Sequence, residues 1–423
     1  MKDKKQFIKW ALQVGAVPIL LGILGVLLLM TAFSLPSYRI RAHVYESVNL
    51  LTKEGTYYRF AFRDMCSTLD NVTEATYLNQ ALVGTDMESA LSCALSGYRL
   101  SASSAEPIEN LAAVFDDWES ASIFAGLKRF FNGYEAVIRP LLMMTDYHGI
   151  RQINLYVMLF ISLLLCRLMS KRRLGDYILP LIVSVLLIHP LVIAYNMTFM
   201  GFYLCMVVPS IIFLLMPREE LQKKAHLLFA AIGAVTFYFN MNYFQLLCFA
   251  MPFMFFVLLV GIPKDIQGTA RMFAGAFIPW FVGFAGMMVF KWILYAILID
   301  PAIFRQMLNN ILMRTGLDYG PRSYAVRKNI QTALSNRKWL LSETVFVLYS
   351  VFMWWKNKGK LHMNSSSILL FLIMLLVPVL RYALFANHVI IHSFVMYRIL
   401  MMPVLALNFL ITEAWHEKES VGI

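Results

Sequence analysis

The sequence predicts an all-α, polytopic helical membrane protein with about ten transmembrane helices. Two observations lead to this prediction. The chain of 423 residues is 59% hydrophobic and 15% charged, whereas soluble domains are about 45 to 50% apolar and about 25% charged. Its apolar residues also form continuous stretches, unlike the alternating pattern of a membrane β-barrel. No internal repeat is visible, so a single membrane domain over residues 1–423 is the simplest organisation.

Apolar stretches separate the polar parts of the chain. Several are close to the roughly 20 residues that cross a bilayer as a helix, and the third to the sixth are shorter, which indicates tilt or burial inside a bundle. The stretches are 10–33, 150–169, 177–195, 199–216, 225–239, 244–260, 272–292, 339–355, 366–384 and 389–412. The first is too long for the ~7 to 15-residue apolar core of a signal peptide, so we expect a retained anchor.

Positive charges mark the expected cytoplasmic side. Lys and Arg precede the first stretch and follow the second and the eighth, whereas the short turns near 196, 241 and 387 carry none. By the positive-inside rule, both termini are then cytoplasmic. The two long polar segments, 34–149 and 293–338, become extracytoplasmic. The net charge of +12 is spread over loops, which is a topology signal and gives no support to a nucleic-acid partner.

The first long segment, 34–149, is predicted to be largely helical. One helix is expected to begin at Asp70-Asn71, because Asn71 and Glu74 have the spacing of a capping box. Residues 101–110, rich in Ser and containing Pro, are expected to form a loop. A further helix is predicted over 116–129, with acidic residues in its first turn.

The chain has five cysteines, and two of them, Cys66 and Cys93, lie in the first long segment. A disulfide between them and a pair of free thiols are both open, because sequence does not give the Cβ geometry that a disulfide requires. The other three lie in apolar stretches and are interpreted as small packing residues. No Cys/His spacing matches a zinc site, and the use of a divalent metal stays open.

Short motifs are spread over most of the chain. They are Leu69-Asp70-Asn71-Val72-Thr73 with Leu78-Asn79; Asn132-Gly133-Tyr134 with Arg139-Pro140-Leu141-Leu142; Tyr243-Phe244; Trp280, Gly283 and Lys291-Trp292; and Asn387-His388, His392 and Tyr397-Arg398. Together they resemble a group of polytopic membrane proteins of Gram-positive bacteria. In that group an aspartate commonly follows the Tyr-Phe pair, and Gln245 stands in that place here.

The layout of the chain resembles the GT-C superfamily of membrane glycosyltransferases. The shared features are a cytoplasmic N-terminus, a large outer loop with acids between the first two helices, and a second outer segment between helices 7 and 8. This resemblance implies a GT-C-like fold in the bacterial plasma membrane and sugar transfer at its outer face. The implied partners are membrane lipid, a polyprenyl-phosphate-linked sugar donor and an envelope glycan or polymer acceptor.

Such a transfer requires a base for the acceptor hydroxyl and cations for the leaving phosphate. Asp70 is the candidate catalytic base, since it lies at a predicted helix start near Tyr57 and Tyr58, which are suited to lining a sugar site. Its alternative role is only to cap the helix. Asp116 and Asp117 are weaker candidates, because an acidic run of this kind usually forms a solvated first helical turn.

Seven residues are candidates for substrate binding: Tyr134, Arg139, Lys291, Arg314, His388, His392 and Arg398. Arg398 falls inside the tenth stretch, where an Arg costs ~2.5 to 3.5 kcal/mol, so it is expected to face the bundle interior. A re-entrant hairpin over 385–398 would remove that cost. His388 and His392 have the i, i+4 spacing that places two side chains on one helical face.

Several of these candidates also have a structural interpretation. Lys291 beside Trp292 has the pattern of an interfacial snorkelling lysine. Either histidine of the pair is as readily a hydrogen-bonded structural residue. The arginines of 293–338, Arg314 among them, suit bidentate phosphate contact and equally suit contact with anionic lipid headgroups.

Three functions from different classes therefore remain. A glycosyltransferase predicts a lateral groove near Asp70, Lys291 and Arg398 that opens to the outer leaflet. A transporter or flippase of a lipid-linked substrate predicts polar groups at the bilayer midplane and broken helices. A non-catalytic subunit of an envelope-assembly system predicts that substitution of Asp70 or Arg398 leaves activity unchanged.

Overall fold

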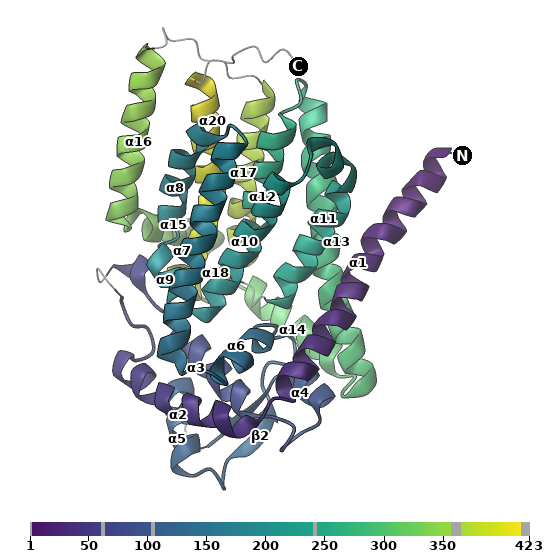
Figure 1. Cartoon of the computed structure of the whole chain (residues 1–423), viewed down its shortest axis with the longest axis vertical. Helices are drawn as coiled ribbons and strands as arrows, with labels where there is room; N and C mark the ends of the chain where they lie inside the picture. The colour runs from purple at the N-terminus through teal and green to yellow at the C-terminus, as the bar shows by residue number, and fades with distance from the viewer. Residues whose placement is uncertain (1, 61–63, 103–105, 240–242, 357–364, 416–423) are drawn as a thin grey trace.

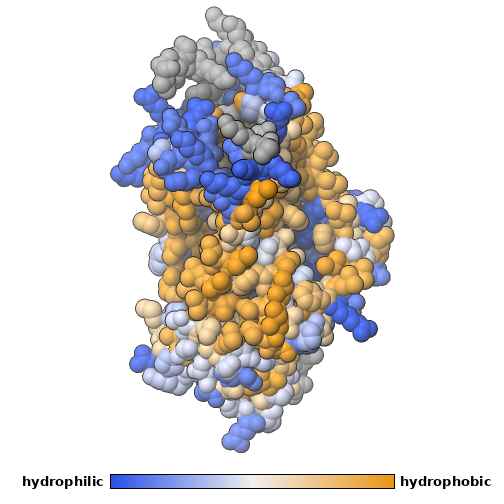
Figure 2. All heavy atoms as spheres, turned by 90° about the vertical axis from the view of Figure 1, so that its right-hand side faces the viewer, coloured by the Kyte–Doolittle hydropathy of each residue, from blue (hydrophilic) through white to orange (hydrophobic). Residues whose placement is uncertain are grey.

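The computed structural model describes residues 2–60, 64–102, 106–239, 243–356 and 365–415, which are almost entirely helical. A helical bundle fills the upper part of Figure 1, and shorter helices form a cap at its lower end. The visible face of the bundle carries a broad apolar belt with more polar surface above and below it (Figure 2). The all-α prediction is confirmed for the described residues, apart from one small antiparallel sheet of β1 (Tyr98–Ser101) and β2 (Ser122–Ala125).

Six helical segments among the described residues are long and apolar enough to cross a membrane. They are Lys4–Phe33, Tyr147–Lys171, Met197–Leu215, Ile266–Leu298, Ser365–Leu384 and Ser393–Glu413. These segments fit a multi-pass membrane protein. The predicted count of about ten spans is not confirmed, because the remaining apolar stretches form helices that are short, interrupted or polar at one end.

The bundle is built from the long apolar helices and their shorter neighbours. Its members are α1 (Lys2–Phe33), α7 (Tyr147–Lys171), α8 (Ile178–Leu186), α9 (Pro190–Ala194), α10 (Met197–Leu215), α11 (Arg218–Tyr238), α12 (Gln245–Val260), α13 (Ile266–Leu298), α16 (Arg337–Lys356), α17 (Ser365–Leu384) and α20 (Met401–Trp415), with the 3₁₀ turn η2 (Gly175–Tyr177) before α8. Helices α11 and α13 pack most closely. A Cβ at Gly233 or Gly283 would collide with the main chain of the facing helix, so both positions require glycine.

The cap comes from residues 34–149. It contains α2 (Ser37–Glu54), η1 (Met65–Ser67), α3 (Asn71–Leu82), α4 (Ala90–Ser96), α5 (Pro107–Asp116) and α6 (Glu135–Leu142), together with β1 and β2. The helix predicted over 116–129 is wrong, because α5 already ends at Asp116 and β2 follows it. The loop prediction over 101–110 is wrong from Pro107 onward, where α5 begins, and residues 103–105 lie outside the described residues. The proline occupies the first helical position, where it costs no hydrogen bond.

The second long segment contributes α14 (Ile303–Thr315) and α15 (Arg322–Leu334), and it contacts the first. Arg129 Nη1 donates to Asn310 Oδ1 at 3.4 Å. The Cys66 thiol donates to the carbonyl of Thr332 at 3.0 Å. The two long polar segments, separated by some 150 residues of membrane helices in the sequence, therefore meet in space.

Two of the predicted apolar stretches are broken. The third is interrupted at His189, which has a left-handed φ of 59° and precedes Pro190. The tenth is divided into α18 (Ala386–Ile391), α19 (Ser393–Met396), η3 (Tyr397–Leu400) and α20. Residues 386–400 therefore form short helical pieces and α20 begins only at Met401, while the re-entrant hairpin over 385–398 stays a prediction.

The apolar interior is divided into two clusters. The bundle core contains Leu69, Tyr243 and Tyr397 along with most of α10, α12 and α20. The lower core joins the cap to α1, α11 and α13 and contains Tyr77 and Phe131. Cys66 belongs to the bundle core and Cys93 to the lower core, and both are free thiols. Of the two alternatives for Cys66 and Cys93, the structure therefore shows the pair of free thiols and not the disulfide.

Candidate functional site

Asp70 is the N-cap of α3 and lies almost fully buried, at 2% exposure. Its carboxylate accepts hydrogen bonds from Thr73 N (3.3 Å), Thr73 Oγ1 (2.7 Å) and Tyr243 OH (3.0 Å). The capping role proposed for Asp70 is confirmed, and the capping box proposed for Asn71 is wrong. Burial raises the pKa of Asp70, and the hydrogen bonds from Thr73 and Tyr243 oppose that rise.

Glu74, one turn further along α3, binds the start of α10. Its carboxylate accepts hydrogen bonds from Met197 N (2.9 Å), Thr198 N (3.2 Å) and Thr198 Oγ1 (3.0 Å), and from the hydroxyl of Tyr147. A carboxylate at a helix N-terminus is stabilised by the free N–H groups there and by the helix dipole. Glu74 therefore fixes α3 against the membrane helices and holds Asp70 in place.

Asn196 links the two carboxyl-bearing residues. With its amide turned to the orientation that satisfies both neighbours, its nitrogen donates to Glu74 Oε1 at 2.7 Å and its oxygen accepts from Asp70 N at 3.1 Å. Asn196 is fully buried just before α10. Since every polar group in this set has a partner, the start of α3 is a rigid platform.

Arg398 faces the interior, as the sequence predicts. It is fully buried, and its guanidinium donates to the carbonyls of Ile188 and Phe394, each at 2.9 Å, and lies 4.7 Å from the centre of the Phe199 ring. Its positive charge is among the influences that lower the pKa of Asp70 against the effect of burial. Asp70 and Arg398, distant in the sequence, are thus brought into one region.

Tyr243 connects Asp70 to the two histidines. The centre of its ring lies 6.4 Å from that of His388 and 5.6 Å from that of His392, and the two imidazole rings are 4.9 Å apart. Helix α18 ends at Ile391, so His392 lies just beyond it, yet both histidines face the same residue. His388 is 5% exposed, and among the described residues its Nδ1 has no hydrogen-bond partner.

Arg314, at the end of α14, lies beside the histidines. Asn387 Nδ2 donates to the carbonyl of Met313 at 2.9 Å, which fixes the residue before Arg314 against the residue before His388. Burial, together with the charge of Arg314, lowers the pKa of His392 to about 4. His392 is therefore neutral at neutral pH.

Two further arginines, Arg381 and Arg129, lie close enough to His388 to affect its pKa. After burial and Arg314, the charges of Arg381 and Arg129 also lower the pKa of His388. Burial and the neighbouring Arg129 lower the pKa of Arg314 to about 10. We refer to Arg129, Arg314, Arg381, His388 and His392 as the cation cluster. Among the described residues, no Asp or Glu forms an ion pair with Arg129 or Arg314.

Two of the predicted substrate-binding residues lie elsewhere. Arg139 is fully buried and donates to the carbonyls of Ala32 (2.9 Å), Val83 (2.8 Å) and Ala81, so its burial is explained without a ligand. Lys291 is also fully buried rather than snorkelling, and its ammonium donates to the carbonyl of Leu95. Both residues contact the lower core and not the surroundings of Asp70.

Tyr134 lies between these two regions. Its ring stacks on that of Tyr77 with 3.5 Å between centres, and its hydroxyl donates to Asn132 Oδ1 at 2.9 Å. Tyr77 in turn is close enough to Tyr243 for the two phenols to interact electrostatically. Tyr134 is therefore separated from the Asp70 region by one aromatic ring.

Sequence reasoning missed four residues that contribute to this region: Thr73, Arg129, Tyr243 and Arg381. Arg381 carried a usable signal, because it lies inside the ninth apolar stretch, and an ionisable residue in a membrane helix is a functional candidate by default. Tyr243 belongs to a noted motif but received no role. Nothing in the sequence distinguishes Arg129 from the other basic residues of the first long segment.

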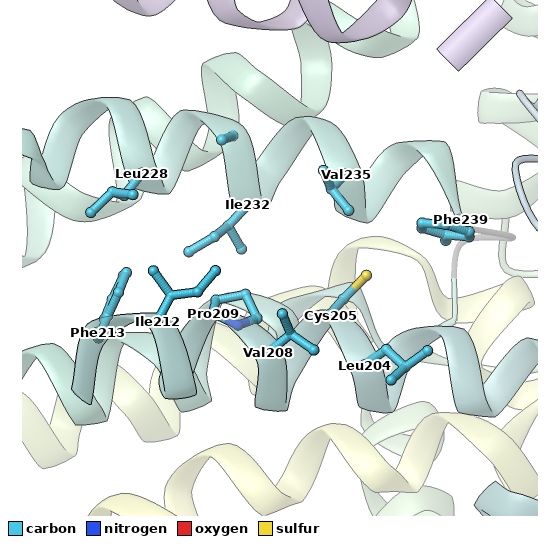
Figure 3. A pocket seen from close by; sticks show the side chains of 11 residues that line it. Leu204, Cys205, Val208, Pro209, Ile212, Phe213, Leu228, Ile232, Val235 and Phe239 are labelled. Atoms are coloured by element: carbon cyan, nitrogen blue, oxygen red, sulfur yellow. The ribbon is translucent and has the colours of Figure 1, made fainter. Parts of the chain in front are cut away.

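The structure also forms an apolar groove of about 320 Å³ between α10 and α11 (Figure 3). Its lining is purely apolar apart from one thiol and includes Leu204, Val208, Ile232 and Phe239. A second apolar groove lies between α1 and α6. Asp70, Lys291 and Arg398 line neither of these two, so the groove predicted beside them stays a prediction.

Within the described part of the chain, no three His, Cys, Asp or Glu residues are grouped so that they could hold a metal ion. Comparison of the chain with protein-family models, with curated proteins and with solved structures finds no match. The site itself is then the basis for a functional assignment.

Proposed function

We propose that the protein is a membrane glycosyltransferase that uses a polyprenyl-phosphate-linked sugar. It acts at the outer face of the bacterial plasma membrane, with both termini cytoplasmic, and modifies a cell-envelope polymer or glycan. The observation that carries the proposal is the position of the Asp70–Tyr243 pair beside the cation cluster. A proton acceptor and a region for an anionic leaving group are the two requirements of the reaction.

In this proposal Asp70 accepts the proton of the acceptor hydroxyl as its oxygen attacks C1 of the donor sugar. The bond between C1 and the phosphate oxygen breaks, and the phosphate leaves with the electron pair. The raised pKa of Asp70 suits proton transfer, because a base with a pKa closer to neutrality accepts a proton more readily. Tyr243 donates to the carboxylate and holds its orientation.

The apolar groove between α10 and α11 supports a lipid-linked donor. It lies within the bundle and offers almost only hydrocarbon surface, which suits an isoprenoid chain (Figure 3). Phe239 lines the groove, and only four peptide steps link it to Tyr243. At most about 14 Å of extended chain therefore separates the groove from the residue that binds Asp70.

Two other functions each have one observation in their favour. The Asp70 carboxylate is buried and engaged by Thr73 and Tyr243, as in a structural residue, which favours a non-catalytic envelope-assembly subunit. The interruptions at His189 and over 386–400 resemble the broken helices of transporters, which favours a flippase.

The deciding experiment measures sugar transfer by the purified protein in lipid nanodiscs. It uses a panel of polyprenyl-phosphate sugars and envelope glycan acceptors. Asp70→Asn keeps the size of the side chain and an oxygen to cap α3, and we expect it to lower the transfer rate by about 100-fold or more. Glu119→Gln, at an exposed acid of the same segment that is not a candidate base, should retain the wild-type rate.

Thermal unfolding of each variant shows whether loss of transfer reflects loss of folding. Transfer at the wild-type rate by folded Asp70→Asn would exclude Asp70 as the base. Movement of the lipid-linked sugar between leaflets without transfer would instead identify a flippase. If the protein neither transfers the sugar nor moves the lipid-linked sugar between leaflets with any donor, the function as a non-catalytic assembly subunit would remain.

A further inference from the structure

We infer that α14 is an interfacial helix whose outer apolar face lies in the bilayer surface on the side of the cap. The inference concerns the second long segment, which the sequence predicts to be extracytoplasmic, and it does not depend on sugar transfer. Two observations carry it. The helix has three faces with different surroundings, and its exposed apolar face begins next to the exposed apolar end of α13.

The first face of α14 packs on the protein. Ile303 and Met307 are buried in the lower core. Asn310 follows on the same face and accepts a hydrogen bond from Arg129 Nη1 at 3.4 Å. The spacing of these three residues, i, i+4 and i+7, is that of one side of a helix. The contacts within the fold therefore account for this face.

The second face of α14 is apolar and exposed. Four large side chains share it, with between 44% and 60% of their surface exposed: Phe304, Leu308, Ile311 and Leu312. Their spacing, i, i+4, i+7 and i+8, places them within an arc of about 100° on an ideal helix. Single exposed apolar residues are ordinary on a protein surface, but four on one side of one helix form a patch that indicates a partner.

The third face of α14 is mainly polar. Arg305 and Asn309 are exposed on it and Gln306 is half-buried, with Met313 as the apolar exception near the end of the helix. At 13 residues, α14 is also too short to span a bilayer. A short helix with one apolar and one polar exposed face has the pattern of a helix that lies in the plane of a membrane surface.

The end of α13 indicates that lipid covers the apolar face. Helix α13 is long and apolar enough to cross a membrane, and its last residues, Ile297 and Leu298, are 74% and 50% exposed. Only residues 299–302 separate α13 from Ile303, a distance of at most about 18 Å along an extended chain. Figure 1 shows α14 at the junction of the bundle and the cap. The helix therefore begins close to the level at which α13 leaves the bilayer.

The position of Arg314 follows from this arrangement. It lies in the last turn of α14, on the row of Ile303, Met307 and Asn310, and so on the packed face. An interfacial helix reaches about 5 to 10 Å into the boundary between headgroups and acyl chains with its apolar face. Arg314, and with it the histidines of the cation cluster, is then close to the level of the lipid phosphates.

The test measures the depth of nitroxide labels by electron paramagnetic resonance. The full chain is placed in nanodiscs of phosphatidylcholine and phosphatidylglycerol. Oxygen concentrates among the acyl chains and a water-soluble nickel chelate stays outside, so their relative collision rates with a label report its depth. Leu308→Cys carries a label on the apolar face, and Asn309→Cys carries the matched label on the polar face. Both are made with Cys166→Ala, since Cys166 is half-buried and the other four cysteines are buried.

We expect the label at position 308 to lie about 5 to 10 Å into the boundary between headgroups and acyl chains, and the label at 309 to collide mainly with the chelate. Phe304→Cys and Arg305→Cys repeat the comparison one turn earlier, and thermal unfolding identifies any variant that is not folded.

Two results would overturn the inference. Equal access of the chelate to positions 308 and 309 would place α14 in water. A label at 308 that neither oxygen nor the chelate reaches would show that protein, such as a second copy of the chain, covers the apolar face. Neither result depends on sugar transfer, so a failure of the proposed function and a failure of this inference are distinguishable.

Discussion

Two groups of basic side chains in this protein have different surroundings: the fully buried Arg139 and Lys291 of the lower core, and the half-buried arginines of the cation cluster. In the lower core, Arg139 and Lys291 donate to main-chain carbonyls, and Arg139 alone links α1, α3 and α6. In the cation cluster, Arg129 makes one long contact to a side-chain amide, and Arg314 forms no ion pair with any described acid. The first pattern is that of residues that hold a fold together, and the second leaves donors for a ligand.

This comparison predicts that the largest loss of folding stability follows substitution of Arg139. Truncation by Arg139→Ala removes several hydrogen bonds to carbonyls in a dry interior and leaves those carbonyls unpaired. At about 1.5 to 3 kcal/mol for a hydrogen bond to a charged group, the loss should exceed 3 kcal/mol and lower the yield of folded protein. Thermal unfolding in detergent measures the change.

Arg314→Ala is the matched truncation in the other region. It removes a charge that neighbouring cations repel, so we expect the melting temperature to stay the same or to rise. If Arg314→Ala destabilised the protein as much as Arg139→Ala, the distinction between the two regions would be lost.

A smaller effect is expected at Glu74. The N–H groups of Met197 and Thr198 bind different oxygens of Glu74, so in Glu74→Gln the amide NH₂ must face one of these two donors. The charge that stabilises the start of α10 is also gone. We expect a loss of about 1 to 3 kcal/mol. Chemical unfolding of the variant gives the value, and Glu46→Gln, at an exposed acid outside this network, serves as the reference. An unchanged stability in Glu74→Gln would show that α10 does not need the carboxylate.

The histidines give the cluster a pH dependence of moderate size. The pKa of His392, about 4 in the folded chain, lies below its ordinary value of 6.5 because of burial and Arg314, with His388 and Tyr243 also against the ring. The unfolded chain therefore takes up a proton as the pH falls below 6.5, and stability is lost between pH 6.5 and pH 4. Thermal unfolding of His392→Gln should show a smaller loss of stability between pH 6.5 and pH 4 than that of the wild-type protein. The difference between the two proteins isolates His392 from other titrating groups.

The sequence predicted the general architecture because apolar composition and continuous apolar stretches follow directly from what a bilayer requires. It predicted Asp70 as a helix start and Arg398 as an interior residue for similarly local reasons. It did not decide between a continuous helix and a re-entrant hairpin over 385–398, since the path of the chain there depends on tertiary partners such as the Ile188 carbonyl that binds Arg398. It also could not show that Arg139 and Arg314 have different surroundings, because that difference exists only after distant segments meet.

The smallest expected effect is on the reactivity of the cysteines. It compares a thiol of the bundle core, Cys66, with a thiol of the lower core, Cys93. Cys66 and Cys93 are buried in different cores, and burial raises the pKa of both, that of Cys93 to about 12. A thiol reacts as its thiolate, so a maleimide should label neither residue at neutral pH until the chain is unfolded. Mass spectrometry of peptides from native and denatured samples measures this. Recovery of a peptide pair joined through Cys66 and Cys93 would contradict the separation of the two cores, because a disulfide requires their Cα atoms to lie within about 7 Å.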